Sequence, residues 1–152
     1  MRRCNFSGTD EAVNLTRGGF GYRYESMTGQ IIITDDDDDI RLMLRHIFES
    51  EGWKVLEAAD GAQSLDTCQR EGCDLLVLDQ MMPGQTGLEV AKELRKKGFD
   101  RPIVLFSAYL TGDVRQEAEA LEIWPVSKVD INGLIKVVRG LMREPESAAP
   151  EA

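Results

Sequence analysis

The sequence predicts an α/β fold in which five parallel strands alternate with five helices between residues 30 and 142. Short apolar runs alternate with segments whose apolar residues recur at helical spacing. The run Leu75–Leu78 is continuously apolar, which is typical of a parallel strand buried on both faces. Strands that alternate with helices in this way favour one parallel sheet covered by helices on both sides.

The first strand contains Ile31–Ile33, and the second contains Lys54–Leu56 and ends before a turn at Asp60-Gly61. Between them, residues 38–51 show the i, i+3, i+4, i+7, i+8 spacing of an amphipathic helix. The apolar face of that helix consists of Ile40, Met43, Leu44, Ile47 and Phe48. The remaining elements are predicted, in order, as a helix over 62–71, a strand over 74–78, a helix from about Leu88 to Gly98, a strand over 102–106, a weaker helix through Val114, Ala118 and Leu121, a short strand at 125–127, and a strongly amphipathic helix over 131–142.

The two ends of the chain lack this alternation. Residues 1–29 are rich in Gly, Arg, Asn, Ser and Thr, and we expect a disordered extension there. Residues 143–152 contain two Pro and three Ala without an apolar period, which predicts a frayed tail. Because the alternating strands and helices are confined to residues 30–142, the sequence predicts one domain that stands alone, with no second domain expected after it.

Charge and composition exclude several function classes. The net charge is −9, and because residues 1–29 hold four Arg and three acids, the acidity belongs to the body of the protein. An acidic body argues against binding to nucleic acid or to an anionic membrane. Three cysteines without metal-ligand spacing indicate reduced thiols in a cytoplasmic protein. The single histidine, His46, is predicted to lie on the surface and excludes a His-based catalytic site within the chain.

Polar residues follow four of the predicted strands at the point where each strand ends. Asp35 and Asp36 follow the first strand, Asp79 the third, Ser107 the fourth, and Lys128 the fifth. Because the carboxyl ends of parallel strands share one edge, where open α/β sheets bind ligands, we expect these side chains to meet. Clustered carboxylates repel one another unless a cation neutralises them, and Mg²⁺ prefers carboxylate oxygens. Residues 37–39 continue the acidic run and are explained by a solvated helix N-terminus.

Asp79 is the strongest candidate because it ends a buried strand and precedes a loop. A carboxylate in this position can attack a phosphoryl group, while a metal ion neutralises the phosphoryl oxygens. Lys128 could contact the phosphate as a point charge, and Ser107 could donate a hydroxyl hydrogen bond to it. Each residue alone has a simpler explanation, as a cap, a turn residue or a surface lysine. Their positions at successive strand ends favour the phosphate site.

With these residues in place, the stretch 30–142 resembles the receiver domain of bacterial two-component response regulators. The residues that carry the resemblance are Ile32-Ile33-Thr34-Asp35-Asp36-Asp37, Ala59-Asp60-Gly61, Asp74-Leu75-Leu76-Val77-Leu78-Asp79-Gln80-Met81-Met82-Pro83-Gly84, Gly87-Leu88-Glu89, Pro102-Ile103-Val104-Leu105-Phe106-Ser107-Ala108 and Lys128. The resemblance implies a flavodoxin-like fold with strand order 2-1-3-4-5, an arrangement for which this family is itself the standard illustration.

The resemblance also implies roles for the site residues. Asp79 would be the phosphoacceptor, taking a phosphoryl group from a phosphohistidine of a sensor histidine kinase or a phosphotransfer protein. Asp36, Asp79 and the backbone carbonyl of Met81 would bind Mg²⁺ or Mn²⁺ directly, and Asp35 would act through a bound water. Lys128 would contact the phosphoryl group, and Ser107 would report it to the face formed by the last two helices and the last strand.

That face would bind a downstream protein partner, and the resemblance also allows a homodimer through it. A protein of this kind is not an enzyme in the usual sense, because it catalyses only its own phosphorylation and dephosphorylation. Two departures from the family bear on this switch. Val129 follows Lys128 where the family usually has proline, so we expect a trans peptide bond there, since a cis bond would cost about 2.5–4 kcal/mol. Pro125 takes the position of the usual aromatic residue, and Trp124 either replaces that residue or packs in the core.

Two other functions compete with the phosphorylated switch. The departures at Pro125 and Val129 motivate a protein-binding module that has the receiver fold but works independently of phosphate. An aspartyl-nucleophile hydrolase resembling the haloacid dehalogenases would need an acid two residues after the nucleophile. That position is Met81, which argues against a hydrolase.

Overall fold

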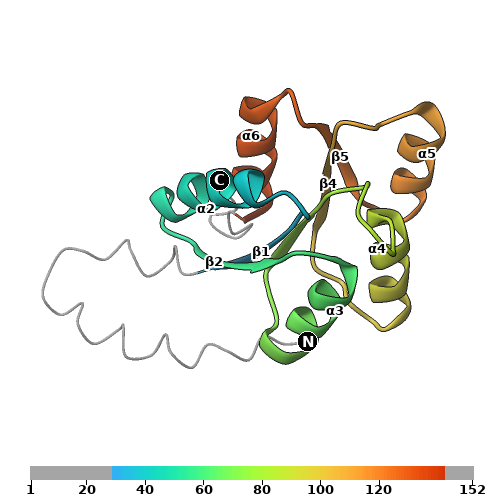
Figure 1. Cartoon of the computed structure of the whole chain (residues 1–152), viewed down its shortest axis with the longest axis horizontal. Coiled ribbons are helices and arrows are strands. Elements are labelled where there is room, and N and C mark those ends of the chain that lie inside the picture. The colour runs from blue at the N-terminus through green and yellow to red at the C-terminus, as the bar shows by residue number, and fades with distance from the viewer. Residues whose placement is uncertain (1–28, 143–152) are drawn as a thin grey trace, which may run out of the picture.

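The computed structural model describes residues 29–142, and within this range it contains five strands and five helices (Figure 1). The strands are β1 (Gln30–Thr34), β2 (Lys54–Ala58), β3 (Leu75–Leu78), β4 (Ile103–Ser107) and β5 (Trp124–Ser127). The helices are α2 (Asp38–Ser50), α3 (Gly61–Glu71), α4 (Gly87–Lys96), α5 (Gly112–Ala120) and α6 (Ile131–Met142). The predicted extension and tail fall outside the described residues, apart from Gly29. Among residues 29–142, no helix combines the length and the apolarity needed to cross a bilayer.

All five strands are parallel and lie in the order β2-β1-β3-β4-β5, so the predicted fold class and topology are confirmed. The register aligns Thr34 of β1 with Leu78 of β3, and Ser107 of β4 with Ser127 of β5. The carboxyl ends of these strands therefore lie along one edge of the sheet, where the polar residues singled out in the sequence follow.

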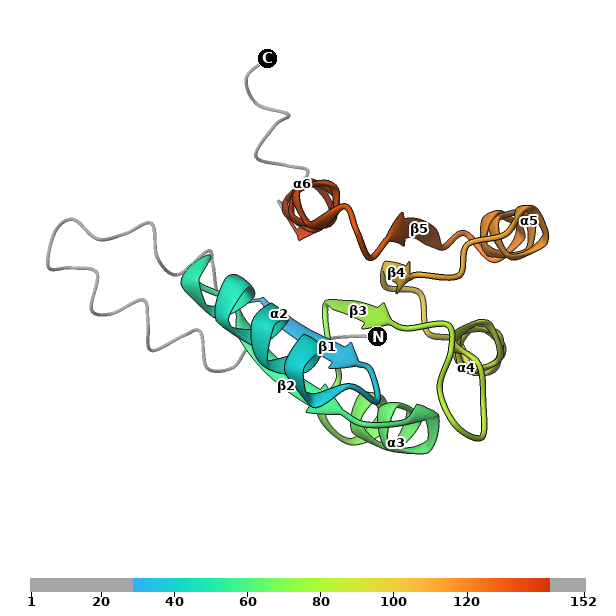
Figure 2. The same ribbon diagram turned by 45° about the horizontal axis from the view of Figure 1, so that its top comes forward.

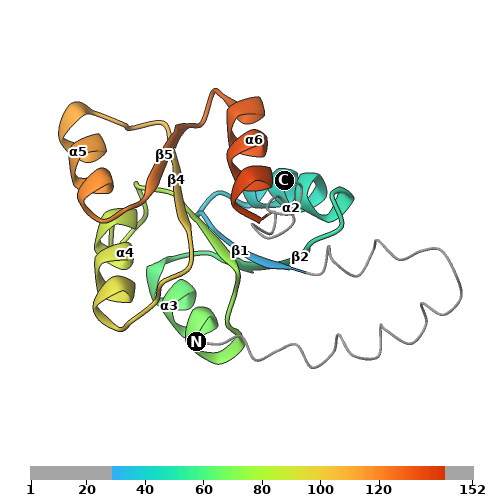
Figure 3. The same ribbon diagram turned by 180° about the vertical axis from the view of Figure 1, so that it is seen from behind.

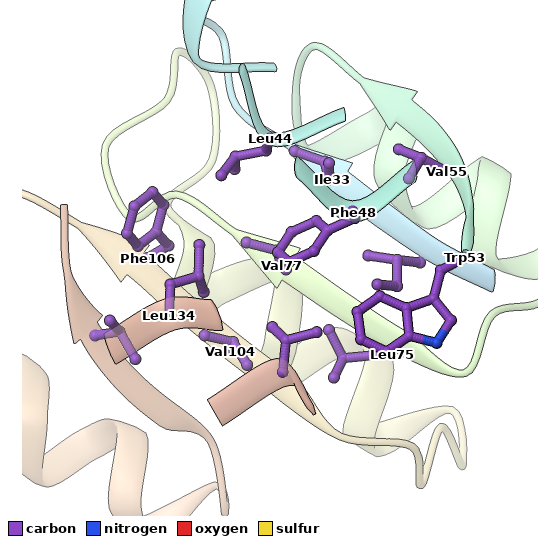
Figure 4. Packing of buried hydrophobic residues seen from close by; sticks show 13 residues of the cluster. Ile33, Leu44, Phe48, Trp53, Val55, Leu75, Val77, Val104, Phe106 and Leu134 are labelled. Atoms are coloured by element: carbon purple, nitrogen blue, oxygen red, sulfur yellow. The ribbon is translucent and has the colours of Figure 1, made fainter. Parts of the chain in front are cut away.

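The helices form two layers, with α2 and α6 on one face of the sheet and α3, α4 and α5 on the other (Figures 2 and 3). The strands supply both layers by alternation, because successive side chains of a strand point to opposite faces. Thus Ile31 and Ile33 pack under α2 and α6, while Ile32 packs towards α3 and α4. Phe48 and Leu134 fill the first layer, shown in Figure 4.

Local hydrogen bonds set the beginnings of the helices. Asp37 is the N-cap of α2, and its carboxylate accepts hydrogen bonds from the backbone N–H groups of Asp39 (2.9 Å) and Ile40 (3.4 Å). The acids predicted to suit a helix N-terminus therefore do so. Thr86 and Glu89 form a reciprocal capping box at the start of α4.

The two tryptophans differ in their surroundings. Trp53 is buried against Phe48, with ring centroids 6.1 Å apart (Figure 4). Trp124 is 49% exposed on the edge strand β5, so the interpretation that it packs in the core is wrong. Trp124 is the first residue of this strand, and Val126, which lies two residues further on and on the same face, is the one that packs in the layer of α2 and α6.

The edge of the sheet opposite the predicted site is held together by one arginine. Arg95 of α4 donates hydrogen bonds to the backbone carbonyls of Phe99 and Arg101, and to those of Leu121 and Glu122. These contacts join the end of α4 to the segment between α5 and β5. Glu122 has a φ of 60°, a left-handed conformation that is uncommon for a residue other than glycine.

Candidate metal and phosphoryl site

Three carboxylates meet at the carboxyl edge of the sheet, as the sequence predicted. Asp35, Asp36 and Asp79 each place a carboxylate oxygen within 4.8 Å of the other two. Asp35 and Asp79 are 2% and 6% exposed, whereas Asp36 lies at the solvent side. The sheet ladder continues one residue past the strand ends, because Asp35 N–H donates to the Ala58 carbonyl and Asp79 N–H to the Thr34 carbonyl. This continuation fixes the backbone that carries the two buried acids.

Lys128 bridges the two buried carboxylates. Its Nζ lies 2.8 Å from Asp35 Oδ2 and 3.2 Å from Asp79 Oδ2. Its backbone N–H donates to the carbonyl of Ser107 at 3.0 Å, which ties the end of β5 to the end of β4. No peptide bond of the described residues is cis, so the trans bond predicted between Lys128 and Val129 is confirmed, and Val129 points to solvent with 90% exposure.

The charges in this cluster shift the titration of Asp79 and Lys128. Burial raises the pKa of Asp79, and the nearby negative charge of Asp35 raises it further, although Lys128 opposes both effects. Burial alone would lower the pKa of Lys128, but hydrogen bonds and charge from Asp35 and Asp79 outweigh it and leave the pKa raised. The ammonium is therefore firmly protonated at neutral pH.

Ser107 and Met81 occupy the neighbouring loops. Ser107 is fully buried at the end of β4, and its hydroxyl oxygen accepts a hydrogen bond from Tyr109 N–H at 3.0 Å. Met81 N–H donates to Asp79 Oδ1 at 3.4 Å. The side chains of Met81 and Tyr109 are 51% and 59% exposed, so they extend outward from the two loops that flank the site. Met82, by contrast, is buried and packs in the layer of α3, α4 and α5.

Two further residues position Asp79, although the sequence indicated them only as parts of a motif. Gln80 is buried and caps α4, because its backbone carbonyl accepts from Gly87 N–H (3.0 Å) and its Oε1 from Leu88 N–H (2.9 Å). A Cβ atom at Gly87 would collide with the carbonyl oxygen of Asp79. The loop after Asp79 thus returns to α4 with backbone packed on backbone, which requires glycine at that position.

The donor set fits a hard divalent cation. All three acidic groups offer oxygen ligands, and the single ammonium of Lys128 balances one of the three negative charges. The remaining two negative charges match the charge of Mg²⁺, which binds through one or two carboxylates and retains waters. The exposed position of Asp36 leaves the open side of the cluster towards solvent.

Comparisons with known proteins identify the family of the chain. The family model for the response regulator receiver domain matches residues 31–131. Sporulation initiation phosphotransferase F of Bacillus subtilis is 35% identical over 95 residues, which span 62% of this chain and 77% of that protein. The alkaline phosphatase synthesis transcriptional regulatory protein PhoP of the same organism is 31% identical over 133 residues, which span 83% of this chain but 53% of that protein. The chain therefore spans about half the length of this second relative.

Solved structures resemble the fold over its whole length. The response regulator protein TrrA of Thermotoga maritima, crystallised in complex with Mg²⁺ and BeF, is 33% identical, with a TM-score of 0.68 over 75% of this chain and 99% of that one. The receiver domain of the Francisella response regulator 1452 is 27% identical, with a TM-score of 0.71 over 76% and 97% of the two chains. This chain therefore belongs to the response regulator receiver domains of two-component systems.

Proposed function

We propose that the chain is a phosphorylatable switch in which Asp79 accepts a phosphoryl group in a Mg²⁺-dependent reaction. The donor would be a phosphohistidine on a sensor histidine kinase or on a phosphotransfer protein. The observation that carries the proposal is the bridge from Lys128 to Asp35 and Asp79, which gathers one ammonium and two buried carboxylates at the sheet edge. The name of one relative, a sporulation initiation phosphotransferase, and the Mg²⁺–BeF complex of another both support it.

The reaction would begin with an ionised Asp79. One carboxylate oxygen forms a bond to phosphorus while the phosphorus–nitrogen bond to the donor histidine breaks, and the imidazole nitrogen keeps the electron pair. Asp36, Asp79 and the Met81 carbonyl would hold Mg²⁺ or Mn²⁺, with Asp35 acting through a water. The bound ion supplies neutralisation of the charge on the phosphoryl oxygens. Lys128 would transfer from its carboxylate partners to a phosphoryl oxygen, since its ammonium already lies 3.2 Å from Asp79.

The readout would run through Ser107. Its hydroxyl can donate to a phosphoryl oxygen, and it lies one residue from Ala108 and two from Tyr109, at the start of the loop that leads to α5. A shift of this loop would change the face of α5, β5 and α6, on which Trp124 is exposed. A downstream protein would bind this face, and a homodimer is the other arrangement it allows. The chain would catalyse only its own phosphorylation and dephosphorylation.

The test uses beryllofluoride, which mimics an aspartyl phosphate. Tryptophan fluorescence is followed during titration with Mg²⁺ and then with beryllofluoride, in the wild type and in Asp79→Asn. Trp124→Phe shows which tryptophan reports, and fluorine NMR detects binding that leaves fluorescence unchanged. A saturable signal that is lost in Asp79→Asn supports the phosphoacceptor. If the wild type gives no signal by either method, the proposal fails, and the module that works independently of phosphate becomes the better explanation.

A further inference from the structure

A partly buried ion-pair network lies beside the acidic cluster and reaches into it through one arginine. Arg41 lies in the first part of α2, with a side chain that is 15% exposed. Its Nε donates to Glu57 Oε1 at 2.9 Å, and its Nη1 donates to the backbone carbonyl of Asp35 at 2.7 Å. Its Nη2 contacts Asp38. A single guanidinium therefore joins α2, β2 and the turn between β1 and α2.

We propose that Arg41 is a positioning residue for the metal-binding carboxylates. The carbonyl that it holds belongs to the peptide group between Asp35 and Asp36. Because a peptide group is planar, fixing this oxygen fixes the backbone direction on both sides of it. The two acids flanking that peptide are two of the three that meet at the site. Arg41 thereby sets where Asp36, the exposed member, presents its oxygens.

The turn has a second constraint, which is formed by the side chain of Asp35. Asp37 N–H donates to Asp35 Oδ1 at 2.9 Å, so one carboxylate oxygen of Asp35 is tied to the turn while the other contacts Lys128. Arg41 N–H in turn donates to the carbonyl of Asp37 at 3.1 Å. The arginine thus holds the turn from its backbone and from its side chain, across the same few residues that carry the acids.

Glu57 keeps the arginine in place and balances its charge. Glu57 lies on β2 opposite Ile33 of β1, and Ile33 precedes Asp35 by two residues. The side chain of Glu57 is 28% exposed. Burial would lower the pKa of Arg41, but Glu57 and Asp38 outweigh it, so the guanidinium stays charged. Because this charge is paired with Glu57, the arginine orders the turn without acting as a counter-ion that competes with a metal.

Arg45 provides a matched control within the same network. Its Nε donates to the other oxygen of Glu57 at 2.8 Å, and its Nη1 contacts Glu49, so within residues 29–142 its side chain forms no hydrogen bond to the turn at Asp35. Arg41→Gln and Arg45→Gln remove the same charge and one contact to the same glutamate. Only the first also releases the Asp35 carbonyl. Arg41→Lys keeps the charge but removes the planar fork that reaches two oxygens at once.

The experiment titrates the wild type and the variants with MgCl₂ by calorimetry, and follows the amide NMR signals of Asp36 and Asp37. Free energies of unfolding are measured in EDTA. We expect Arg41→Gln to weaken Mg²⁺ binding about tenfold or more, because removing the partner of a metal ligand commonly costs that much. Arg41→Lys should show a similar loss, while Arg45→Gln should stay within about twofold, although it too breaks an ion pair with Glu57.

The inference rests on the proposed metal site, and the outcomes separate the two. If the wild type binds Mg²⁺ and Arg41→Gln binds it within twofold, the positioning role is refuted while the metal site stands. Equal weakening by Arg41→Gln and Arg45→Gln would also refute it, since charge or general stability would then explain both. A wild type that gives no Mg²⁺ signal overturns the metal site and the inference together. A selective loss in the two Arg41 variants, with shifted Asp36 and Asp37 signals, supports it.

Discussion

Asp79→Asn should raise the free energy of unfolding of the metal-free protein, because a buried carboxylate is replaced by a neutral group of the same shape. At an effective dielectric constant of about 20, repulsion from Asp35 at up to 4.8 Å amounts to about 3.5 kcal/mol, and attraction to Lys128 at 3.2 Å to about 5 kcal/mol. Exposed Asp36, screened by water, adds about 1 kcal/mol of repulsion. The charge interactions nearly cancel. The desolvation of the carboxylate, which costs several kcal/mol, then decides the sign. We expect a net stabilisation of about 1–3 kcal/mol.

The assay is urea unfolding in EDTA, followed by far-UV circular dichroism and by the fluorescence of buried Trp53. Asp66→Asn is the control, because it removes the same charge from an exposed ion pair on α3 and should change stability by less than about 0.5 kcal/mol. Adding Mg²⁺ should then reduce the difference in the free energy of unfolding between Asp79→Asn and the wild type. A ligand at one hundred times its Kd stabilises the wild type by about 2.7 kcal/mol, and the variant has lost a ligand group.

The pH dependence gives an independent check on the same reasoning. Because the pKa of Asp79 is raised in the folded state, its contribution to stability is fully present below the ordinary value of 3.8 and is lost as the pH rises through the folded-state value. The advantage of Asp79→Asn should therefore shrink as the pH falls from 7 towards 4. A variant that is less stable than the wild type in EDTA at pH 7, or an advantage that does not change with pH, would refute the reasoning.

Three other predictions follow from the geometry. Glu122→Gly should stabilise the fold by about 0.5–1 kcal/mol in urea unfolding, because glycine relieves the left-handed φ of 60° while the carbonyl bound by Arg95 remains; a loss of stability would contradict this. Gly87→Ala should lower the free energy of unfolding by about 1–3 kcal/mol, because the new methyl group would meet the Asp79 carbonyl. The control Gly140→Ala has open space around the new methyl group and should be neutral or stabilising, and equal effects of the two variants would show that the contact is unimportant. Cys73 should react with iodoacetamide at pH 8 more slowly than an exposed cysteine introduced by Ser50→Cys, because only the thiolate reacts. A hydrogen bond with Cys68 and burial raise the pKa of the Cys73 thiol well above the ordinary value. Peptide mass spectrometry measures both rates, and equal rates would contradict this prediction.

The fold could be predicted because its elements are locally encoded. The continuous apolar run before Asp79 indicated a strand buried on both faces, and both layers indeed draw on it: Leu75 and Val77 pack towards α2 and α6, and Leu76 and Leu78 towards α3, α4 and α5. The acids at the site could be placed because parallel strands bring their ends together. This argument needs only the order of strands along the chain, so it placed Lys128 near Asp79 across 49 residues of sequence.

Other features depend on contacts that no local pattern carries. The role of Arg41 depends on Glu57, which lies on a different strand, and on a backbone carbonyl, which has no sequence signature at all. The exposure of Trp124 depends on which strand forms the edge of the sheet and on the position of Val126. Periodicity could not choose between the core and the surface for an aromatic residue next to Pro125, because the strand has only four residues.

The two edges of the sheet differ in how firmly the neighbouring chain segments are joined, and Arg95 causes this difference. At the edge away from the acids, its guanidinium binds carbonyls from both sides of β4 and clamps the base of α4 to the chain that enters β5. At the acidic edge, the loops that follow β3 and β4 carry half-exposed Met81 and Tyr109. If the proposed switch displaces the loops at the acidic edge, we expect the movement of α4, α5 and β5 to be largest beside the carboxylates and smallest at Arg95, where these hydrogen bonds join the chain segments.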